Sequence, residues 1–182
     1  EAYLSGYRTI GSDLDPRMVD YTTKNLLWLE DTVMRGNPQP RRVGVRTLAE
    51  KDSIFKPTVK PGDATSMTWS EPFDTIAAET YLGRALSSMP DHETLQKIIN
   101  DCDTIHTKFL KNVARQTKPG FRMCIAIPAW STARGFKHLK TLDNLEQLGY
   151  NRVKFVHAKN EDLIYHRPGQ IVARELVILT RR

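Results

Sequence analysis

Three acidic residues each follow a segment that is typical of a buried strand: Asp13 after 7–12, Asp63 after 58–60 and Glu79 after 73–78. Ligands of open α/β sheets bind at the carboxyl ends of the parallel strands, so we expect these carboxylates at one edge of a sheet. A carboxylate accepts hydrogen bonds from hydroxyl and amino groups. The series therefore predicts a site for a ligand that offers such donors.

The first two segments, "GSDLDP" and "PGDA", suggest contacts with a nucleoside. Asp13 stands where doubly wound nucleotide-binding folds hold ribose hydroxyls, and Leu14 could pack against a flat ring. An alternative is that Asp13 and Asp15 only cap the helix that follows. In the second segment, Asp63 could accept from an adenine amino group and the Ala64 amide could donate to a ring nitrogen. Gly-Asp is also common in turns, so this segment alone is weak evidence for a nucleoside contact. Its place in the ordered series strengthens that interpretation.

The third segment is "ETYLG", and the ordered series resembles the class I S-adenosylmethionine-dependent methyltransferases. Within them it is most similar to the tRNA guanine-N2 methyltransferase family of RNA methylases. "GYRTIGSDLDPRMVDYTTKNLLWL" is similar to that family's segment after its glycine-rich loop, and "PGDAT" to its adenine-contacting segment. "FDTIAAETYLG" is similar to its Asp-Pro-Pro-Tyr-Gly strand and loop, and "YHRPGQIVARELVILTR" to its terminal hairpin. The resemblance covers almost the whole chain.

The resemblance implies an enzyme that transfers a methyl group from S-adenosylmethionine to an exocyclic amine of an RNA base, with guanine N2 in tRNA as the first candidate. The residues that would contact the cofactor are Asp13, Leu14, Asp63 and Ala64. The enzyme would align the amine, the methyl carbon and the sulfur, and an aromatic side chain would stack on the flipped-out base. The reaction needs no metal, and we expect no metal site.

Position by position, the resemblance places the catalytic acid at Glu79, the two prolines at Thr80 and Tyr81, the stacking aromatic at Leu82 and the glycine at Gly83. Glu79 is one methylene longer than the family's aspartate, and Leu82 cannot stack as an aromatic ring does. Tyr81 is the candidate replacement, shifted by one place. We therefore predict Glu79, Tyr81 and Gly83 as the catalytic residues.

Two other functions fit the same segments. A DNA adenine-N6 or cytosine-N4 modification methylase uses the same loop chemistry on a different nucleic acid. A non-catalytic RNA-binding protein could keep the methyltransferase fold with an "ETYL" loop that no longer acts. Methyl transfer to tRNA, to DNA or to neither distinguishes the three.

The elements that must position these residues alternate between strands and helices. We expect strands at 7–12, 42–47, 58–60, 73–78 and 121–127, helices at 16–29, 91–116 and 136–148, a loop at 128–134, and a final hairpin around "RPGQ". This order predicts an α/β fold, a Rossmann-like methyltransferase sheet that is mostly parallel and ends in an antiparallel hairpin. We expect one domain over 1–182 with an irregular insertion at 35–60.

Two parts of the family's fold have no counterpart in the sequence: the first strand and the glycine-rich loop, which would precede "EAYLSGY". That loop receives the methionine part of the cofactor. We therefore expect a partial, N-terminally truncated catalytic domain that is itself inactive and binds S-adenosylmethionine weakly or not at all. Low-micromolar binding in calorimetry would contradict this expectation. The sheet edge exposed in this way is a candidate surface for a homodimer.

The two halves of the chain differ in charge. Residues 1–99 carry 12 Lys/Arg and 14 Asp/Glu, whereas residues 100–182 carry 15 and 7. A basic half favours a polyanionic partner such as RNA, with tRNA as the first candidate. The alternative is a solvated basic surface. The candidate phosphate contacts are Arg134, Lys137, Lys140 and Arg167.

The remaining residues of interest suggest a cytoplasmic protein without a membrane span. Cys102 and Cys124 form neither a CxxC nor a Cys/His pattern, so we expect reduced core thiols. No apolar run approaches the ~20 residues of a membrane span. We expect His106 on the surface or in the core rather than in catalysis, and Trp130 either packs under its loop or stacks on a base.

Overall fold

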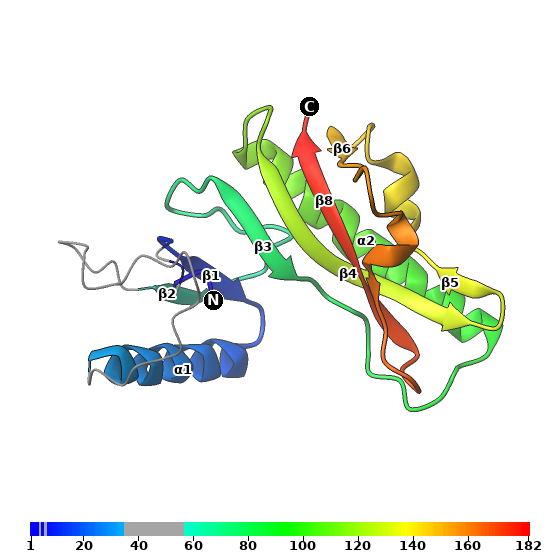
Figure 1. The fold of residues 1–182 in the computed structure, drawn as a ribbon, viewed down its shortest axis with the longest axis horizontal. Coiled ribbons are helices and arrows are strands. Elements are labelled where there is room, and N and C mark those ends of the chain that lie inside the picture. The colour runs from blue at the N-terminus through cyan, green and yellow to red at the C-terminus, as the bar shows by residue number, and fades with distance from the viewer. Residues whose placement is uncertain (4, 6, 35–56) are drawn as a thin grey trace. The chain divides into compact units, whose positions relative to one another are not determined.

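The structure is a computed structural model that describes residues 1–182 except 4, 6 and 35–56 (Figure 1). The chain divides into two compact units, 1–64 and 65–182, and each is described here by itself. The expected strand at 42–47 and most of the insertion lie outside the described residues. The single domain stays a prediction.

The described residues of the first unit form two short parallel strands and one helix. Strand β1 (Ile10–Asp13) pairs with β2 (Thr58–Pro61), and helix α1 (Pro16–Met34) follows β1. The helix begins at the predicted residue because Asp15 caps it: its Oδ1 accepts from the backbone N–H of Arg17 at 2.9 Å. A proline in the first helical position needs no hydrogen-bond partner for its nitrogen, which supports the same start.

The second unit is built on a sheet with the strand order β3-β4-β8-β6 (Figure 1). These strands are β3 (Thr75–Glu79), β4 (Arg122–Thr132), β8 (Val172–Arg181) and β6 (Tyr150–Arg152). Strands β3 and β4 are parallel, and β8 runs antiparallel to both β4 and β6. Three of the four strands therefore share one direction, which confirms a mostly parallel sheet with an antiparallel terminal strand. The homodimer through a sheet edge stays a prediction.

Two short strands extend this sheet. Strand β5 (Gly135–Lys137) folds back on the end of β4, and β7 (Ile164–Tyr165) pairs with β8. A 3₁₀ helix, η3 (Asn160–Leu163), precedes β7. The predicted "RPGQ" turn is confirmed: the N–H of Gln170 donates to the Arg167 carbonyl at 3.1 Å, and the glycine between them has φ +79°.

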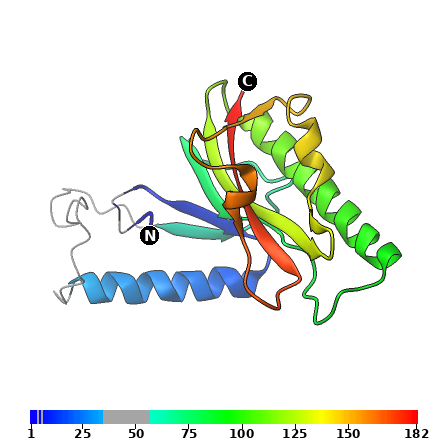
Figure 2. The same ribbon diagram turned by 45° about the vertical axis from the view of Figure 1, so that its right-hand side comes forward.

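Helix α2 (His92–Gln116) runs along one face of the sheet of the second unit (Figure 2). It begins after Asp91, whose side chain accepts from the N–H of Thr94 at 2.9 Å. Its buried residues recur at helical spacing: Leu95, Ile98, Ile99, Cys102, His106, Phe109, Leu110, Asn112 and Val113. The predicted helix at 91–116 is thus confirmed, with a histidine on its buried face.

The predicted helix at 136–148 is wrong. Most of this segment forms β5 and a 3₁₀ helix, η2 (Lys140–Asn144). Its leucines, Leu139, Leu142 and Leu145, recur every third residue, which fits the three residues per turn of a 3₁₀ helix. Leu139 and Leu145 are buried, so the segment contributes to the core without an α-helix.

Strand β4 continues through Pro128, where a loop was predicted. The even-numbered backbone groups of β4 face β3, as the 2.9 Å hydrogen bond from the Thr80 N–H to the Ala126 carbonyl shows. Strand β3 ends at Glu79, opposite Ala126. At position 128 the backbone nitrogen therefore faces the side of β4 beyond the end of β3, where no hydrogen bond to that strand is needed. A proline, which has no N–H, is tolerated there.

Three side chains settle smaller expectations. Trp130 is fully buried in β4, so it packs in the core. Cys102 is buried as predicted, but the expectation of a core thiol is wrong for Cys124, which is exposed on the face of the sheet away from α2.

Among the described residues, no helix combines the length and apolar character needed to cross a membrane.

Tyr150 ties β6 to α2, and its loss should destabilise the fold. The ring is fully buried, and the hydroxyl donates to the Leu110 carbonyl at 2.8 Å. Tyr150→Phe should lower the free energy of unfolding by about 1 kcal/mol, the usual contribution of one buried hydrogen bond. Urea denaturation measures this, with Tyr81→Phe at a half-exposed tyrosine as the control. Equal effects of the two variants would contradict the role of this bond.

Candidate functional site

In the first unit, the carboxyl ends of β1 and β2 carry two of the predicted acids. Asp13 is the last residue of β1, opposite Pro61, and its carbonyl accepts from the N–H of Gly62 at 2.9 Å. Asp63 and Ala64 follow directly along the chain. The structure therefore brings the "GSDLDP" and "PGDA" segments to the same end of one parallel pair. Their role as cofactor contacts stays a prediction.

The structure shows a local role for Asp13, and its contact with a ribose stays a prediction. Its Oδ1 accepts from the N–H of Asp15 at 2.8 Å and closes a local turn, which leaves Oδ2 as an acceptor for a hydroxyl group. Asp15 is the helix cap, and the Arg17 guanidinium that hydrogen-bonds to it lowers the pKa of its carboxyl group. Leu14 is 72% exposed, so its side chain is accessible to a flat ring.

In the second unit, Glu79 ends β3 and forms an ion pair with Arg174 of β8. The Nε of Arg174 donates to Oε2 of Glu79, and its Nη2 lies 3.4 Å from Oε1. This hydrogen-bonded carboxylate raises the pKa of Arg174. The side chain of Glu79 is 51% exposed, so the carboxylate that the sequence singled out is accessible from solvent.

The residue after Glu79 anchors the loop to the core. The Thr80 N–H donates to the Ala126 carbonyl at 2.9 Å, and the Thr80 Oγ1 lies 2.8 Å from the same carbonyl. Oγ1 is also 2.7 Å from Nε2 of His106, whose Nδ1 is 2.7 Å from the Cys102 carbonyl. A carbonyl oxygen only accepts, so Nδ1 carries a proton. Thr80, at the place of a family proline, therefore fixes the loop through hydrogen bonds.

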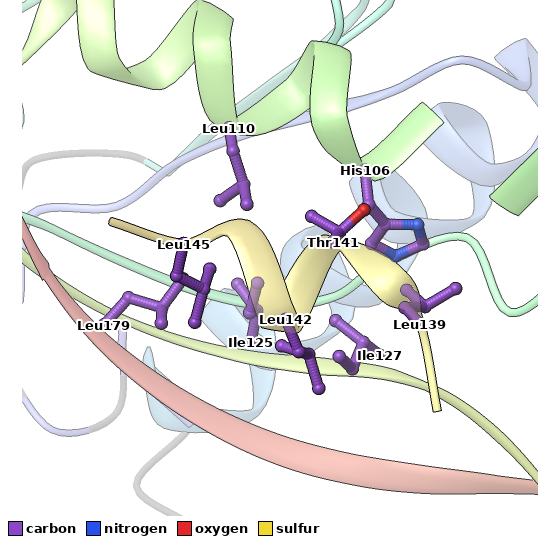
Figure 3. A pocket seen from close by; sticks show the side chains of 9 residues that line it. All are labelled: His106, Leu110, Ile125, Ile127, Leu139, Thr141, Leu142, Leu145 and Leu179. Atoms are coloured by element: carbon purple, nitrogen blue, oxygen red, sulfur yellow. The ribbon is translucent and has the colours of Figure 1, made fainter. Parts of the chain in front are cut away.

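His106 is a structural residue of the core. It lines a cavity of about 10 Å³ whose other walls are apolar apart from Thr141 (Figure 3). This is the room that about one water molecule needs, which is too small for a ligand. Burial lowers the pKa of His106 and outweighs the opposite effects of the Cys102 carbonyl and Asp103. Of the two places expected for His106, the surface and the core, the structure shows the core.

Gly83 is required by the backbone and by its neighbours. Its φ is +89°, and a Cβ there would lie 3.3 Å from Sγ of Cys102 and 3.4 Å from Cγ2 of Ile98. The glycine therefore lets the loop pass close to α2. Tyr81 is 49% exposed, and its role as the stacking aromatic stays a prediction.

The predicted phosphate contacts come from three connections. Arg134 lies between β4 and β5, Lys137 ends β5, Lys140 begins η2, and Arg167 lies in the turn before β8. The rings of Phe136 and His166 meet edge to face with their centroids 5.4 Å apart. This contact brings the β4–β5 and β7–β8 hairpins together at Phe136 and His166. Binding to RNA stays a prediction for all four.

Sequence reasoning missed Arg174 and Tyr165. Tyr165 lies opposite Arg174 in the β7–β8 pairing, and its hydroxyl accepts from Nε of Arg167 at 2.7 Å. Directly opposed residues of an antiparallel pair point to the same face, so these side chains are neighbours. The adjacent arginine and glutamate inside the otherwise apolar run "VARELVIL" were the available signal, because a charge in a central strand needs a partner.

The next residue, Glu175, points to the opposite face and is buried. Its Oε1 lies 2.8 Å from Nη2 of Arg152, and its Oε2 lies 2.5 Å from Nδ1 of His138. The side chain of Glu175 is only 1% exposed, so the Arg152 guanidinium and the His138 ring nitrogen are needed as partners to keep the carboxylate in the core. Among the residues that the structure describes, no group of three or more His, Cys, Asp or Glu is arranged to hold a metal ion.

No family model matches the chain, and the curated proteins contain no match. Solved structures do resemble it. A SAM-dependent methyltransferase from Methanosarcina mazei covers 98% of this chain and 84% of its own, with 16% identity and a TM-score of 0.50. A TehB-like SAM-dependent methyltransferase from Corynebacterium glutamicum covers 100% and 73%, with 17% identity and a TM-score of 0.47. TrmN from Thermus thermophilus covers 95% and 36%, with 15% identity and a TM-score of 0.48.

The first of these similarities establishes the class of fold. The chain has the Rossmann-like α/β fold of the SAM-dependent methyltransferases. The strand order β3-β4-β8-β6, with β8 reversed, agrees with the fold class that the sequence predicts. The chain spans about a third of the length of TrmN.

Substitution of Gly83 tests whether the loop depends on its close approach to α2. Gly83→Ala should lower the free energy of unfolding by about 2–5 kcal/mol, because a left-handed backbone adds about 1–2 kcal/mol and crowding about 1–3 kcal/mol. Gly120→Ala is the matched control: its φ is +85°, but among the described residues no heavy atom lies within 4 Å of the added Cβ. Chemical denaturation that gives equal losses for the two would contradict the packing argument.

Acidification should destabilise the protein through His106. Its pKa is lowered by burial, so the unfolded chain takes up a proton first as the pH falls through 6.5. The stability that neutral His106 contributes is complete above that pH and is lost as the pH falls toward the folded-state pKa. The loss of unfolding free energy between about pH 7.5 and about pH 5 should be smaller in His106→Gln than in wild type. An unchanged pH dependence, with exposed His157→Gln as the control, would contradict this.

Proposed function

We propose that this chain belongs to an enzyme that transfers a methyl group from S-adenosylmethionine to an exocyclic amine of an RNA base, with guanine N2 in tRNA as the first candidate. One observation carries the proposal: acids stand at the carboxyl ends of parallel strands, with Asp13 and Asp63 in the first unit and Glu79 in the second. The fold shared with the methyltransferase from Methanosarcina mazei supports it.

The end of the β1–β2 pair suits the nucleoside part of S-adenosylmethionine. Asp13 uses one carboxylate oxygen within its turn and can accept a ribose hydroxyl with the other. Leu14 offers an exposed apolar surface to the adenine, and Asp63 and Ala64 supply an acceptor and a backbone donor beside it. When bound, S-adenosylmethionine supplies the methyl group.

The end of β3 suits the acceptor amine. Glu79 accepts a hydrogen bond from an amine N–H, which orients the nitrogen and draws its lone pair out of conjugation with the base. Thr80 holds the loop at a fixed distance from β4 through the Ala126 carbonyl, and Gly83 lets it turn against α2. Tyr81 is the proposed stacking residue of this loop, since half of its surface is exposed.

Three features support RNA as the substrate and the cytoplasm as the compartment. Arg134, Lys137 and Arg167 come from two hairpins in contact, and lysine and arginine side chains neutralise phosphates. Lys140 adds a fourth cation from η2. Both cysteines are free, as is usual in a reducing compartment.

Replacement of Glu79 tests the proposed chemistry. The full-length protein should transfer tritium-labelled methyl groups from S-adenosylmethionine to tRNA and not to DNA. Glu79→Gln should lower the rate by about 10- to 100-fold, because a hydrogen bond to a charged group contributes about 1.5–3 kcal/mol. Exposed Glu146→Gln is the matched control and should retain the wild-type rate.

Each alternative has its own outcome in this assay. Transfer to DNA alone would overturn the RNA assignment in favour of a DNA modification methylase. Binding of tRNA without transfer to either nucleic acid would favour the non-catalytic RNA-binding protein. Full transfer by Glu79→Gln would exclude Glu79 as the acceptor.

A further inference from the structure

The guanidinium of Arg174 lies against the carboxylate of Glu79. The two residues are 95 positions apart in the sequence and come from strands that are separated by β4. Nε of Arg174 donates to one oxygen of Glu79, and Nη2 lies 3.4 Å from the other. The planar guanidinium therefore faces both oxygens, which fixes the plane of the carboxylate as well as its position.

Glu79 needs such a restraint more than a shorter acid would. Its side chain has one more rotatable bond than aspartate, is 51% exposed and sits at the end of a strand. An exposed glutamate samples several rotamers, and ordering it is unfavourable in entropy. Because Arg174 starts from the interior of β8, its own backbone is fixed by pairing on both sides.

Neighbouring residues keep Arg174 in place. It lies opposite Pro128 on β4 and opposite Tyr165 on β7, so its side chain is confined between fixed neighbours. The Tyr165 hydroxyl is itself held by Arg167 at 2.7 Å. The side chain of Arg174 is 32% exposed, and its guanidinium stays charged because arginine is not deprotonated in proteins.

Stability does not explain this pair. Ion pairs between exposed side chains contribute little to folding, because solvent screens them and two long side chains lose freedom. A carboxylate has about two acceptor positions on each oxygen, and Arg174 uses one side of the group. The other side stays available to N–H donors from solvent. The pair thus orders an accessible acceptor rather than burying it.

We propose that Arg174 is a positioning residue that holds the carboxylate of Glu79 to accept from the exocyclic amine of a bound base. The inference rests on the proposed function, because it names a residue that acts at the same site. It also explains how the chain uses a glutamate at this position: the arginine removes the freedom that the extra methylene adds.

The test compares two single-stranded RNA heptamers, each labelled with fluorescein and made of uridines around one central base. That base is guanosine in one probe and inosine, which lacks only the N2 amine, in the other. Fluorescence anisotropy on the full-length protein should show about tenfold tighter binding of the guanosine probe, the effect of one charge-assisted hydrogen bond. Glu79→Gln should abolish this preference.

Arg174→Gln should also bring the ratio of the two affinities close to one, and Arg174→Lys should restore part of it. The Glu79→Gln/Arg174→Gln double variant should show no further loss, because both residues act through one contact. Arg134→Gln is the matched control: loss of a phosphate contact should weaken both probes equally and leave the ratio unchanged. Thermal melting checks that each variant is folded. If Arg174→Gln does not fold, Arg174→Lys provides the test.

Two results would overturn the inference. If Arg174→Gln and Arg174→Lys both keep the wild-type ratio while Glu79→Gln loses it, Arg174 does not position Glu79, and the proposed function stands. If wild type binds both probes equally, the pair does not read an amine. Methyl transfer is measured in a separate assay. If no transfer is found, the ratio of the two affinities still tests whether Arg174 acts in base binding.

Discussion

The register of β4 with β3 and with β8 is the constraint on which the second unit depends. It places Glu79 opposite Ala126 and Arg174 opposite Pro128. A shift of β8 by one residue would turn Arg174 to the other face of the sheet and remove it from Glu79. The candidate site of this unit is therefore a product of strand pairing: two residues far apart in sequence meet only because a third strand fixes both.

Two adjacent charges of β8 help to specify that register. Arg174 points to the open face of the sheet, where Glu79 meets it, whereas Glu175 points into the core and meets Arg152 and His138. A shifted strand would bury a cation and expose its neighbour, and a buried charge without its partner is strongly unfavourable. The alternating pattern of "VARELVIL" is thus more than an amphipathic strand, since each charge has one face that accommodates it.

Features set by local chemistry were predictable from the sequence. Helix α2 follows a 3.6-residue period, the "RPGQ" turn follows Pro-Gly geometry, and Asp13 and Glu79 end their strands. Features set by distant residues were not. The strand through Pro128 depends on where β3 ends, and Arg174 depends on a partner across β4. The segment that forms η2 was misread because its leucine spacing of three is close to helical periodicity.

The loop after β3 differs from the loop of the methyltransferases that the sequence resembles in having Glu79 as its acid and Leu82 at the place of the aromatic residue. Arg174 makes these two differences consistent with each other. A longer acid can reach over β4 toward the arginine, and the arginine restores the order that the longer side chain loses. In the proposed function, the orientation of the base is then set by a fixed carboxylate. A stacking aromatic would add contact area to that arrangement without defining it, since stacking tolerates rotation of the base in its plane. The leucine at position 82 is therefore compatible with base recognition through Glu79.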